Sequence, residues 1–143
     1  MVLKKFCYCF CVFVFLLSSC KTTDFAIIDA SYQQWYDGIG VTKGVNLYFL
    51  IQSQKKIKNI EFTDITLDRY HLTPIVVKEK KRITGNFKIK KSDTIKISAP
   101  LVLNNKKFKL TDTMTVNLWY LHNRKKSHIT VSKWIRRKKI FYP

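Results

Sequence analysis

The sequence predicts an all-β fold, an antiparallel sandwich of about 7–9 strands that follows a cleaved N-terminal segment. Apolar and polar residues alternate over short runs, as in strands that bury one face. Turn-forming clusters separate these runs at intervals of about 8–12 residues, a spacing typical of a sandwich or a barrel. Alanine is nearly absent and β-branched residues are abundant, which disfavours helix. We therefore expect one domain over residues 26–143.

The first alternating run is Val45–Ile51, whose regular period predicts a strand with one deeply buried face. Lysines point outward from later runs, at Lys88, Lys90 and Lys96, where they oppose edge-to-edge pairing. The runs expected to form strands are Val45–Ile51, Ile60–Phe62, Ile65–Leu67, Ile75–Val77, Phe87–Ile89, Ile95–Ile97, Val116–Leu121 and Ile129–Val131. The turns expected between them are Asp37–Gly40, Ser53–Lys56, Thr84–Asn86, Lys91–Asp93, Asn104–Lys107 and His122–Ser127.

The N-terminus resembles a bacterial lipoprotein signal. Lys4 and Lys5 precede an uncharged run, Phe6–Leu17, that is shorter than the about 20 residues a spanning helix needs. Leu17-Ser18-Ser19-Cys20 then resembles the lipobox, in which a leucine and two small residues precede the cysteine. The resemblance implies cleavage after residue 19, a thioether-linked diacylglycerol on Cys20 and acylation of the new amine with a fatty acid such as palmitate. An uncleaved signal anchor is the alternative.

Cysteine usage agrees with this interpretation. Cys7, Cys9 and Cys11 would leave with the signal peptide, residues 1–19, and Cys20 would be acylated. No thiol would remain for a disulfide, a metal site or a nucleophile. Two or three acyl chains bind a membrane far more firmly than one, so Cys20 and a short tether, residues 20–25, would hold the domain at the bilayer.

The stretch Ala30–Tyr36, followed by Gly38, Gly40, Gly44 and the strand Val45–Ile51, resembles small uncharacterised lipoproteins of Bacteroidetes. That resemblance implies an immunoglobulin-like sandwich and brings no known activity or site residues. Surface-exposed lipoproteins of that phylum usually carry acidic residues directly after the cysteine. Here Lys21-Thr22-Thr23-Asp24 has one acid, which favours an outer-membrane location facing the periplasm.

The chain is strongly basic, with 27 Lys and Arg against 9 Asp and Glu and a net charge of +18. Two basic runs are candidates for contact with an anionic surface, and the second is flanked by aromatic residues. These candidates are Arg124, Lys125, Lys126, Arg136, Arg137, Lys138 and Lys139. Such runs suit solvated surface, phosphate-bearing lipid or lipopolysaccharide. They also suit nucleic acid, which an exported protein rarely meets, so we expect no nucleic-acid partner.

Other residues give weaker signals. The histidines, His71, His122 and His128, lie among cations or at turns, which disfavours a metal site. Asp64 and Asp68 would share a face of one strand, although such acids more often form ion pairs than a hydrolytic pair. Aromatic residues could stack on a flat ligand but more often form the core. The aromatic candidates are Tyr32, Trp35, Tyr36, Trp119 and Tyr120.

The sequence thus predicts a lipid-anchored cell-envelope protein that serves as a non-catalytic binding or structural module, with no cofactor. Its partner would be the membrane, an anionic polymer or another envelope protein. An accessory subunit that pairs through an exposed strand edge is the second class of function. An envelope hydrolase is the third.

Overall fold

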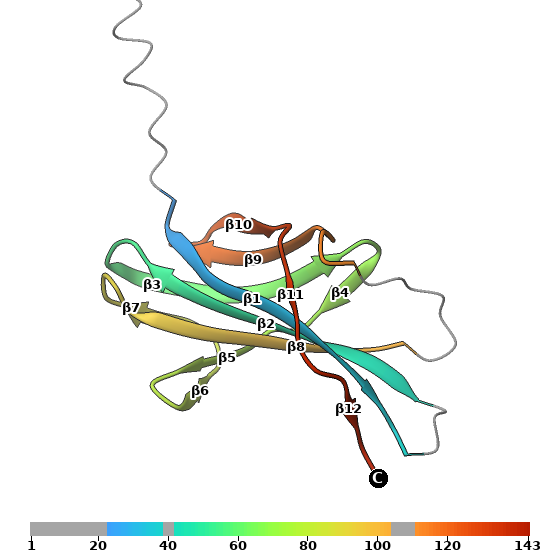
Figure 1. The fold of residues 1–143 in the computed structure, drawn as a ribbon. Coiled ribbons are helices and arrows are strands. Elements are labelled where there is room, and N and C mark those ends of the chain that lie inside the picture. The colour runs from blue at the N-terminus through green and yellow to red at the C-terminus, as the bar shows by residue number, and fades with distance from the viewer. Residues whose placement is uncertain (1–22, 39–41, 104–110) are drawn as a thin grey trace, which may run out of the picture.

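The computed structural model describes residues 23–38, 42–103 and 111–143, and within these ranges all regular structure is β. The strands form two sheets that pack face to face, which confirms the predicted β-sandwich (Figure 1). The strands are β1 Phe25–Tyr36, β2 Lys43–Ser53, β3 Ile57–Leu67, β4 Tyr70–Leu72, β5 Ile75–Lys78, β6 Lys81–Ile83, β7 Phe87–Ile89, β8 Thr94–Val102, β9 Val116–His122, β10 Lys125–Val131, β11 Ile135–Arg136 and β12 Ile140–Phe141.

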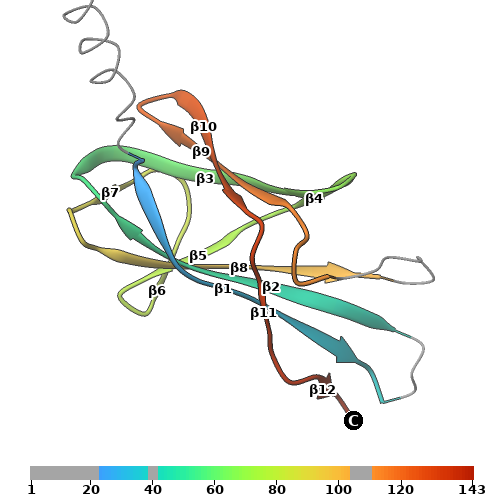
Figure 2. The same ribbon diagram turned by 45° about the horizontal axis from the view of Figure 1, so that its top comes forward.

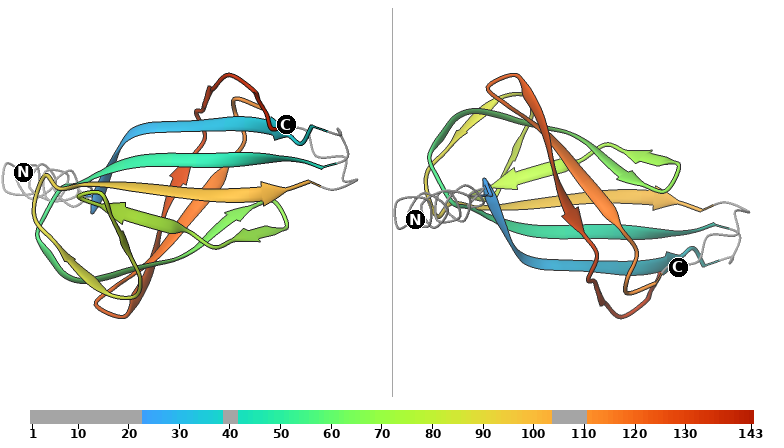
Figure 3. Two further views of the ribbon diagram at one scale, coloured as in Figure 1. Left: turned by 90° about the horizontal axis from the view of Figure 1, so that it is seen from below. Right: turned by 90° about the horizontal axis from the view of Figure 1, so that it is seen from above.

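One sheet has seven strands in the order β11-β1-β2-β8-β5-β6, with β12 also paired to β1. The other has five, in the order β10-β9-β3-β4, with β7 also paired to β3. The chain changes sheet repeatedly, because β3, β4 and β7 belong to the second sheet while β5, β6 and β8 return to the first. Figure 3 shows β9 and β10 crossing the long strands β1, β2 and β8 obliquely.

The core lies between the sheets and follows the predicted alternation. In β2, Leu47 and Ile51 are fully buried while Tyr48 and Leu50 are partly exposed. In the facing sheet, Ile65 of β3 and Leu118 of β9 are fully buried. The outward lysines of β7 and β8 are exposed as expected. Alternation therefore located the faces of the long strands correctly, because each of these strands has one face in the core.

The turn after β9 is tighter than the sequence suggested. Asn123 and Arg124 both have positive φ, at 50° and 66°, which is the geometry of a two-residue hairpin turn. The predicted turn over His122–Ser127 is therefore wrong at both ends, since His122 ends β9 and Lys125 begins β10. The start of β10 is polar and shows no strong alternation, so the sequence pattern does not indicate that it pairs with β9. Glu79 and Lys80 form a similar turn between β5 and β6, with φ of 51° and 63°.

The chain ends in a strap, which we define as residues 132–143, running from the end of β10 to the C-terminus (Figure 2). It contains β11 and β12, which both pair with β1 in parallel. The strictly antiparallel prediction is therefore wrong at this edge. The strand count also exceeds the predicted 7–9, because β4, β6, β7, β11 and β12 have only two or three residues and carry no readable period.

The domain begins slightly earlier than residue 26. Phe25 is already the first residue of β1 and is 4% exposed. It lies edge-on to Tyr120 with ring centroids 5.2 Å apart. Phe25, the last residue of the predicted tether at 20–25, therefore belongs to the folded domain. Cys20 and the signal peptide lie outside the described residues.

Candidate functional site: the N-terminal end and two basic runs

The described chain enters the sandwich through a polar clamp centred on Asp24. The Asp24 carboxylate pairs with the Lys55 ammonium at 2.6 Å and accepts a hydrogen bond from the Tyr120 hydroxyl at 2.9 Å. His122 Nδ1 lies 3.1 Å from the same carboxylate. The Asp24 carbonyl also accepts a hydrogen bond from the Gln54 N–H at 2.9 Å. One strand, β9, and the β2–β3 turn thus hold a single residue just before the start of β1.

The clamp shifts the pKa of its members in opposite directions. Burial opposes ionisation of Asp24, but hydrogen bonds from Lys55, Tyr120 and His122 outweigh it and hold the pKa of the carboxyl below its ordinary value. Burial, together with the nearby Asp24 carboxylate, raises the pKa of Tyr120 to about 12. At neutral pH the clamp therefore contains an ionised Asp24 carboxyl and a neutral Tyr120 phenol.

Three turns gather around this entry point. The Ser53 N–H donates to the Asp93 carbonyl and the Ser92 N–H donates to the Ser53 carbonyl, which joins the β2–β3 and β7–β8 turns. The Asn123 N–H donates to the Asn59 carbonyl, which places the β9–β10 turn beside the start of β3. Figure 1 shows these turns and the chain entry at the same end of the molecule.

These turns carry exposed cations, which we call the basic tip: Lys56, Lys90, Lys91, Arg124 and Lys125. The pairing of Ile57 with Ile89 brings the first two of the connected turns into register, so Lys56 and Lys90 are neighbours across the strands. The first candidate basic run therefore contributes two of its residues, Arg124 and Lys125, to a larger cationic surface.

The third residue of that run has a different environment. The Lys126 ammonium lies 4.7 Å from the centre of the Trp119 ring, within cation–π range. His128 stacks obliquely on the same indole, with ring centroids 4.5 Å apart. Lys126 therefore packs along the outer face of the five-stranded sheet.

The second basic run lies in the strap and is tied to β1. Arg136 Nε donates to the Tyr32 hydroxyl at 2.8 Å, and that hydroxyl donates to Asp112 at 2.6 Å. Arg137 Nε donates to the Ser31 hydroxyl at 2.7 Å. Figure 2 shows the strap beside β1, away from the N-terminal entry. The structure thus separates two runs that the sequence treated alike.

Further contacts fix the second run. The Arg137 guanidinium lies 4.3 Å from the centre of the Tyr48 ring and 3.7 Å from the Asp29 carboxylate. The Lys138 carbonyl accepts a hydrogen bond from the Gln33 amide, and the Lys139 ammonium lies 5.9 Å from the Tyr36 ring. All four residues remain exposed, although both arginine heads bond to the sheet edge.

The described histidines and acids meet only in pairs and form no larger cluster. His71 Nδ1 lies 2.7 Å from Asp64, whereas Asp68 sits in the β3–β4 turn with φ of 52°. The prediction that Asp64 and Asp68 share a strand face is therefore wrong, because β3 ends at Leu67. Among the described residues, no group of three or more His, Cys, Asp and Glu could hold a metal ion.

The aromatic candidates divide between core and edge. Tyr32 and Tyr120 are buried at 0% and 3% exposure, and Trp35 is half-buried. The Trp35 indole closes over Gly44, where a Cβ atom would collide with the ring and with the Leu101 carbonyl. Trp35 therefore packs on its own sheet instead of standing free as a stacking platform.

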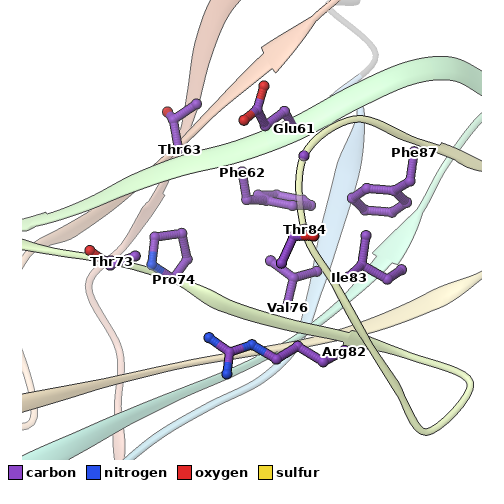
Figure 4. Close-up of a pocket in the computed structure, with 11 residues that line it drawn as sticks. Glu61, Phe62, Thr63, Thr73, Pro74, Val76, Arg82, Ile83, Thr84 and Phe87 are labelled. Atoms are coloured by element: carbon purple, nitrogen blue, oxygen red, sulfur yellow. The ribbon is translucent and has the colours of Figure 1, made fainter.

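A hollow of about 310 Å³ opens between β3 and the segment from Thr73 to Phe87 (Figure 4). The rings of Phe62 and Phe87 lie side by side above Val76 and Ile83, with centroids 6.2 Å apart. The Glu61 carboxylate points away from this apolar floor, and the Arg82 guanidinium lies at its margin. The hollow suits an apolar or flat group, and it lacks a converging set of acids.

The clamp was missed by sequence reasoning. The sequence pattern places Asp24 in the tether and His122 in a turn, because neither residue lies in a motif with recognisable spacing. The one available signal was the abundance of lysine in the turn clusters, at Lys55–Lys56 and Lys91. No helix among the described residues is long and apolar enough to cross a membrane.

Comparison of the chain with protein-family models, with curated proteins and with solved structures finds no match.

Proposed function

We propose that this chain is a lipid-anchored protein of the cell envelope and acts as a non-catalytic binding or structural module. Cys20 carries the lipid in this proposal, and the domain lies at the periplasmic side of the outer membrane, as in the Bacteroidetes lipoproteins that it resembles. The immunoglobulin-like assignment of the sandwich belongs to the same proposal.

The observation that carries the proposal is how soon the fold begins after the lipobox. The Asp24 side chain is 14% exposed and is held by Lys55 from a turn and by Tyr120 from β9. Only Lys21, Thr22 and Thr23 separate it from Cys20. An extended chain advances at most about 3.6 Å per residue, so the clamp stays within about 14 Å of the lipidated residue. A domain so close to its lipid suits a protein that works at the membrane surface.

The bonding of the described acids supports a non-catalytic role. Asp24 and Asp93 pair with Lys55 and Lys78, at 2.6 Å and 3.0 Å. Asp112 accepts from the Tyr32 hydroxyl, which ties the β8–β9 connection to β1. These carboxylates stabilise turns and strand ends, so each has a structural partner where a hydrolytic pair would need two acids facing one cleft.

The test is metabolic labelling of cells with a radioactive fatty acid, comparing the wild-type chain with Cys20→Ser. We expect label on the wild type and none on Cys20→Ser, since a hydroxyl cannot form the thioether. Cys11→Ser is the matched control, because it changes a cysteine of the apolar run and should keep the label. A wild-type protein without label would contradict the proposal.

The edge of β1 favours the second class of function, pairing with a partner strand. Within the described part of the chain, β11 and β12 cover β1 only at Ser31–Tyr32 and Trp35–Tyr36. Ile27 and Ile28, beside a bulge in the uncovered stretch, are 37% and 53% exposed. Photo-crosslinking from position 28 in the envelope would yield a discrete adduct if a partner strand pairs here, and none if the edge is solvated.

A further inference from the structure

We propose that the basic tip binds the phosphate groups of anionic lipid headgroups and so sets the domain upright on the membrane that holds its lipid. The proposal rests on the anchor at Cys20 and adds to it a second, electrostatic contact. It names the partner as an anionic bilayer surface and assigns that contact to Lys56, Lys90, Lys91, Arg124 and Lys125.

The first argument is position. The Asp24 carbonyl bonds to the β2–β3 turn, and that turn bonds to the β7–β8 turn through Ser53, so the chain entry and two basic turns form one connected surface. The β9–β10 turn joins it through Asn123 and Asn59. Because the clamp lies within about 14 Å of Cys20, this end of the sandwich is the part that the tether keeps at the bilayer.

The second argument is that the side chains of these cations have no partner within the described protein that would compete with a lipid phosphate. In the part of the chain that the structure describes, the side chains of the basic tip form no hydrogen bond or ion pair. Two acids at this end of the molecule are already paired with other cations, Asp24 with Lys55 and Asp93 with Lys78. The Lys90 N–H also donates to Asp93 at 2.8 Å, and with Lys78 it holds the pKa of that carboxyl below its ordinary value. The surface therefore remains cationic at neutral and mildly acidic pH.

The third argument concerns the distance over which the basic tip can attract anionic lipid. Attraction between a basic cluster and anionic lipid falls off within a Debye length, about 8 Å at physiological ionic strength. A cluster on the far side of the domain would be screened, whereas the basic tip lies at the end where the tether is attached. The short tether and the cationic turns thus act together, because the tether keeps these turns close enough to the bilayer for their charges to attract anionic lipid.

The strap offers a different orientation, in which the domain lies on its β1 edge. Its exposed apolar residues, Ile135, Phe141 and Tyr142, are suited to a membrane interface. Its arginines, however, bond to Ser31 and Tyr32, and its C-terminal half runs to the end of the molecule opposite the chain entry (Figure 1). The observations favour the upright orientation, and the edge-on one is an outcome of the test.

The experiment uses the full lipidated chain, extracted in detergent and reconstituted into vesicles that contain a lipid with a quencher on its headgroup. A fluorophore is attached at one introduced cysteine, since acylated Cys20 has no free thiol. Gln54→Cys places it in the β2–β3 turn without removing a cation, and Arg69→Cys places it in the β3–β4 turn. These positions lie at opposite ends of β3, about 35 Å apart. Lys138→Cys reports on the strap.

In vesicles containing phosphatidylglycerol, we expect quenching to be strongest at position 54 and weak at positions 69 and 138. Raising the salt to about 1 M shortens the Debye length to about 3 Å and should remove the excess quenching at position 54. Phosphatidylcholine vesicles should do the same. So should replacement of all five residues of the basic tip by glutamine, a surface change that leaves the core intact.

Quenching at position 54 that ignores lipid charge, salt and the glutamine variant would overturn the proposal, because the tether alone would then explain it. Quenching that is strongest at position 138 would overturn it in favour of the edge-on orientation. Both outcomes leave the anchor standing. Wild-type protein that fails to float with the vesicles would instead remove the anchor, and the orientation proposal with it.

Discussion

The two basic runs differ in what their cations do, although their sequences are similar. Arg136 and Arg137 of the strap donate to Tyr32 and Ser31, and Arg137 also lies over the Tyr48 ring. Arg124 and Lys125 lie in and beside a two-residue turn, and their side chains form no hydrogen bond or ion pair with another described residue. The strap arginines fasten the C-terminal segment to the sheet, whereas Arg124 and Lys125 remain available to an external anion. A run of cations therefore reveals little about its role until its neighbours are known.

The first prediction concerns Trp134, which attaches the start of the strap to the core. Trp134 is 6% exposed, donates from Nε1 to the Met114 carbonyl at 2.9 Å and lies edge-on to Phe49 at 5.2 Å. Trp134→Ala should lower the free energy of unfolding by about 3–5 kcal/mol, because it empties a buried ring site. Urea denaturation measures this loss. The neighbouring control, Ile135→Ala, is 64% exposed and should change stability by less than about 0.5 kcal/mol. Equal losses of unfolding free energy in the two variants would show that Trp134 does not attach the strap to the core.

The second prediction concerns the clamp around Asp24 at the N-terminal entry of the sandwich. Asp24→Asn should lower the free energy of unfolding at pH 7 by about 1–3 kcal/mol, because it weakens charge-assisted hydrogen bonds to Lys55, Tyr120 and His122. The folded-state pKa of Asp24 lies below its ordinary value of 3.8. Its contribution is therefore complete above pH 3.8 and is lost as pH falls through the depressed folded pKa.

Denaturation of wild type and Asp24→Asn across the acid range checks this sign. The gap between them should be constant near neutral pH and should close only below pH 3.8. Asp68→Asn is the control, since asparagine also tolerates the positive φ of that exposed turn position. A gap that persists unchanged in strong acid would contradict the role assigned to the Asp24 charge.

Much of the fold could be predicted because the long strands obey a simple rule. Leu47 and Ile51 belong to a set of apolar residues at every second position of Val45–Ile51, and both are buried as that spacing requires. Parallel pairing of β11 and β12 with β1 could not be predicted, because two-residue strands have no period and their partner lies about a hundred residues away. The pairing depends on long-range contacts that only the assembled sheet provides.

The candidate site was predicted less well, for a different physical reason. The basic runs at residues 124 and 136 were visible as charge, but the partners that separate their roles, Tyr32 and Ser31, lie on another strand. The Asp24 clamp joins residues nearly a hundred positions apart and contains no motif. The lipobox at Cys20 is local, and it remains a prediction because it lies outside the described residues.

The central claim is that the side chains of the strap arginines are built into the fold and those of Arg124 and Lys125 are not, and matched substitutions test it most directly. Arg137→Met and Lys125→Met each keep a long aliphatic stem and remove one charge with its donors. The measurement is the free energy of unfolding of both variants by urea denaturation. We expect Arg137→Met to lose about 1–2 kcal/mol, from its hydrogen bond to Ser31 and its contact with Tyr48. Lys125→Met should change stability by less than about 0.5 kcal/mol. Equal losses, or a larger loss at Lys125, would contradict the claim.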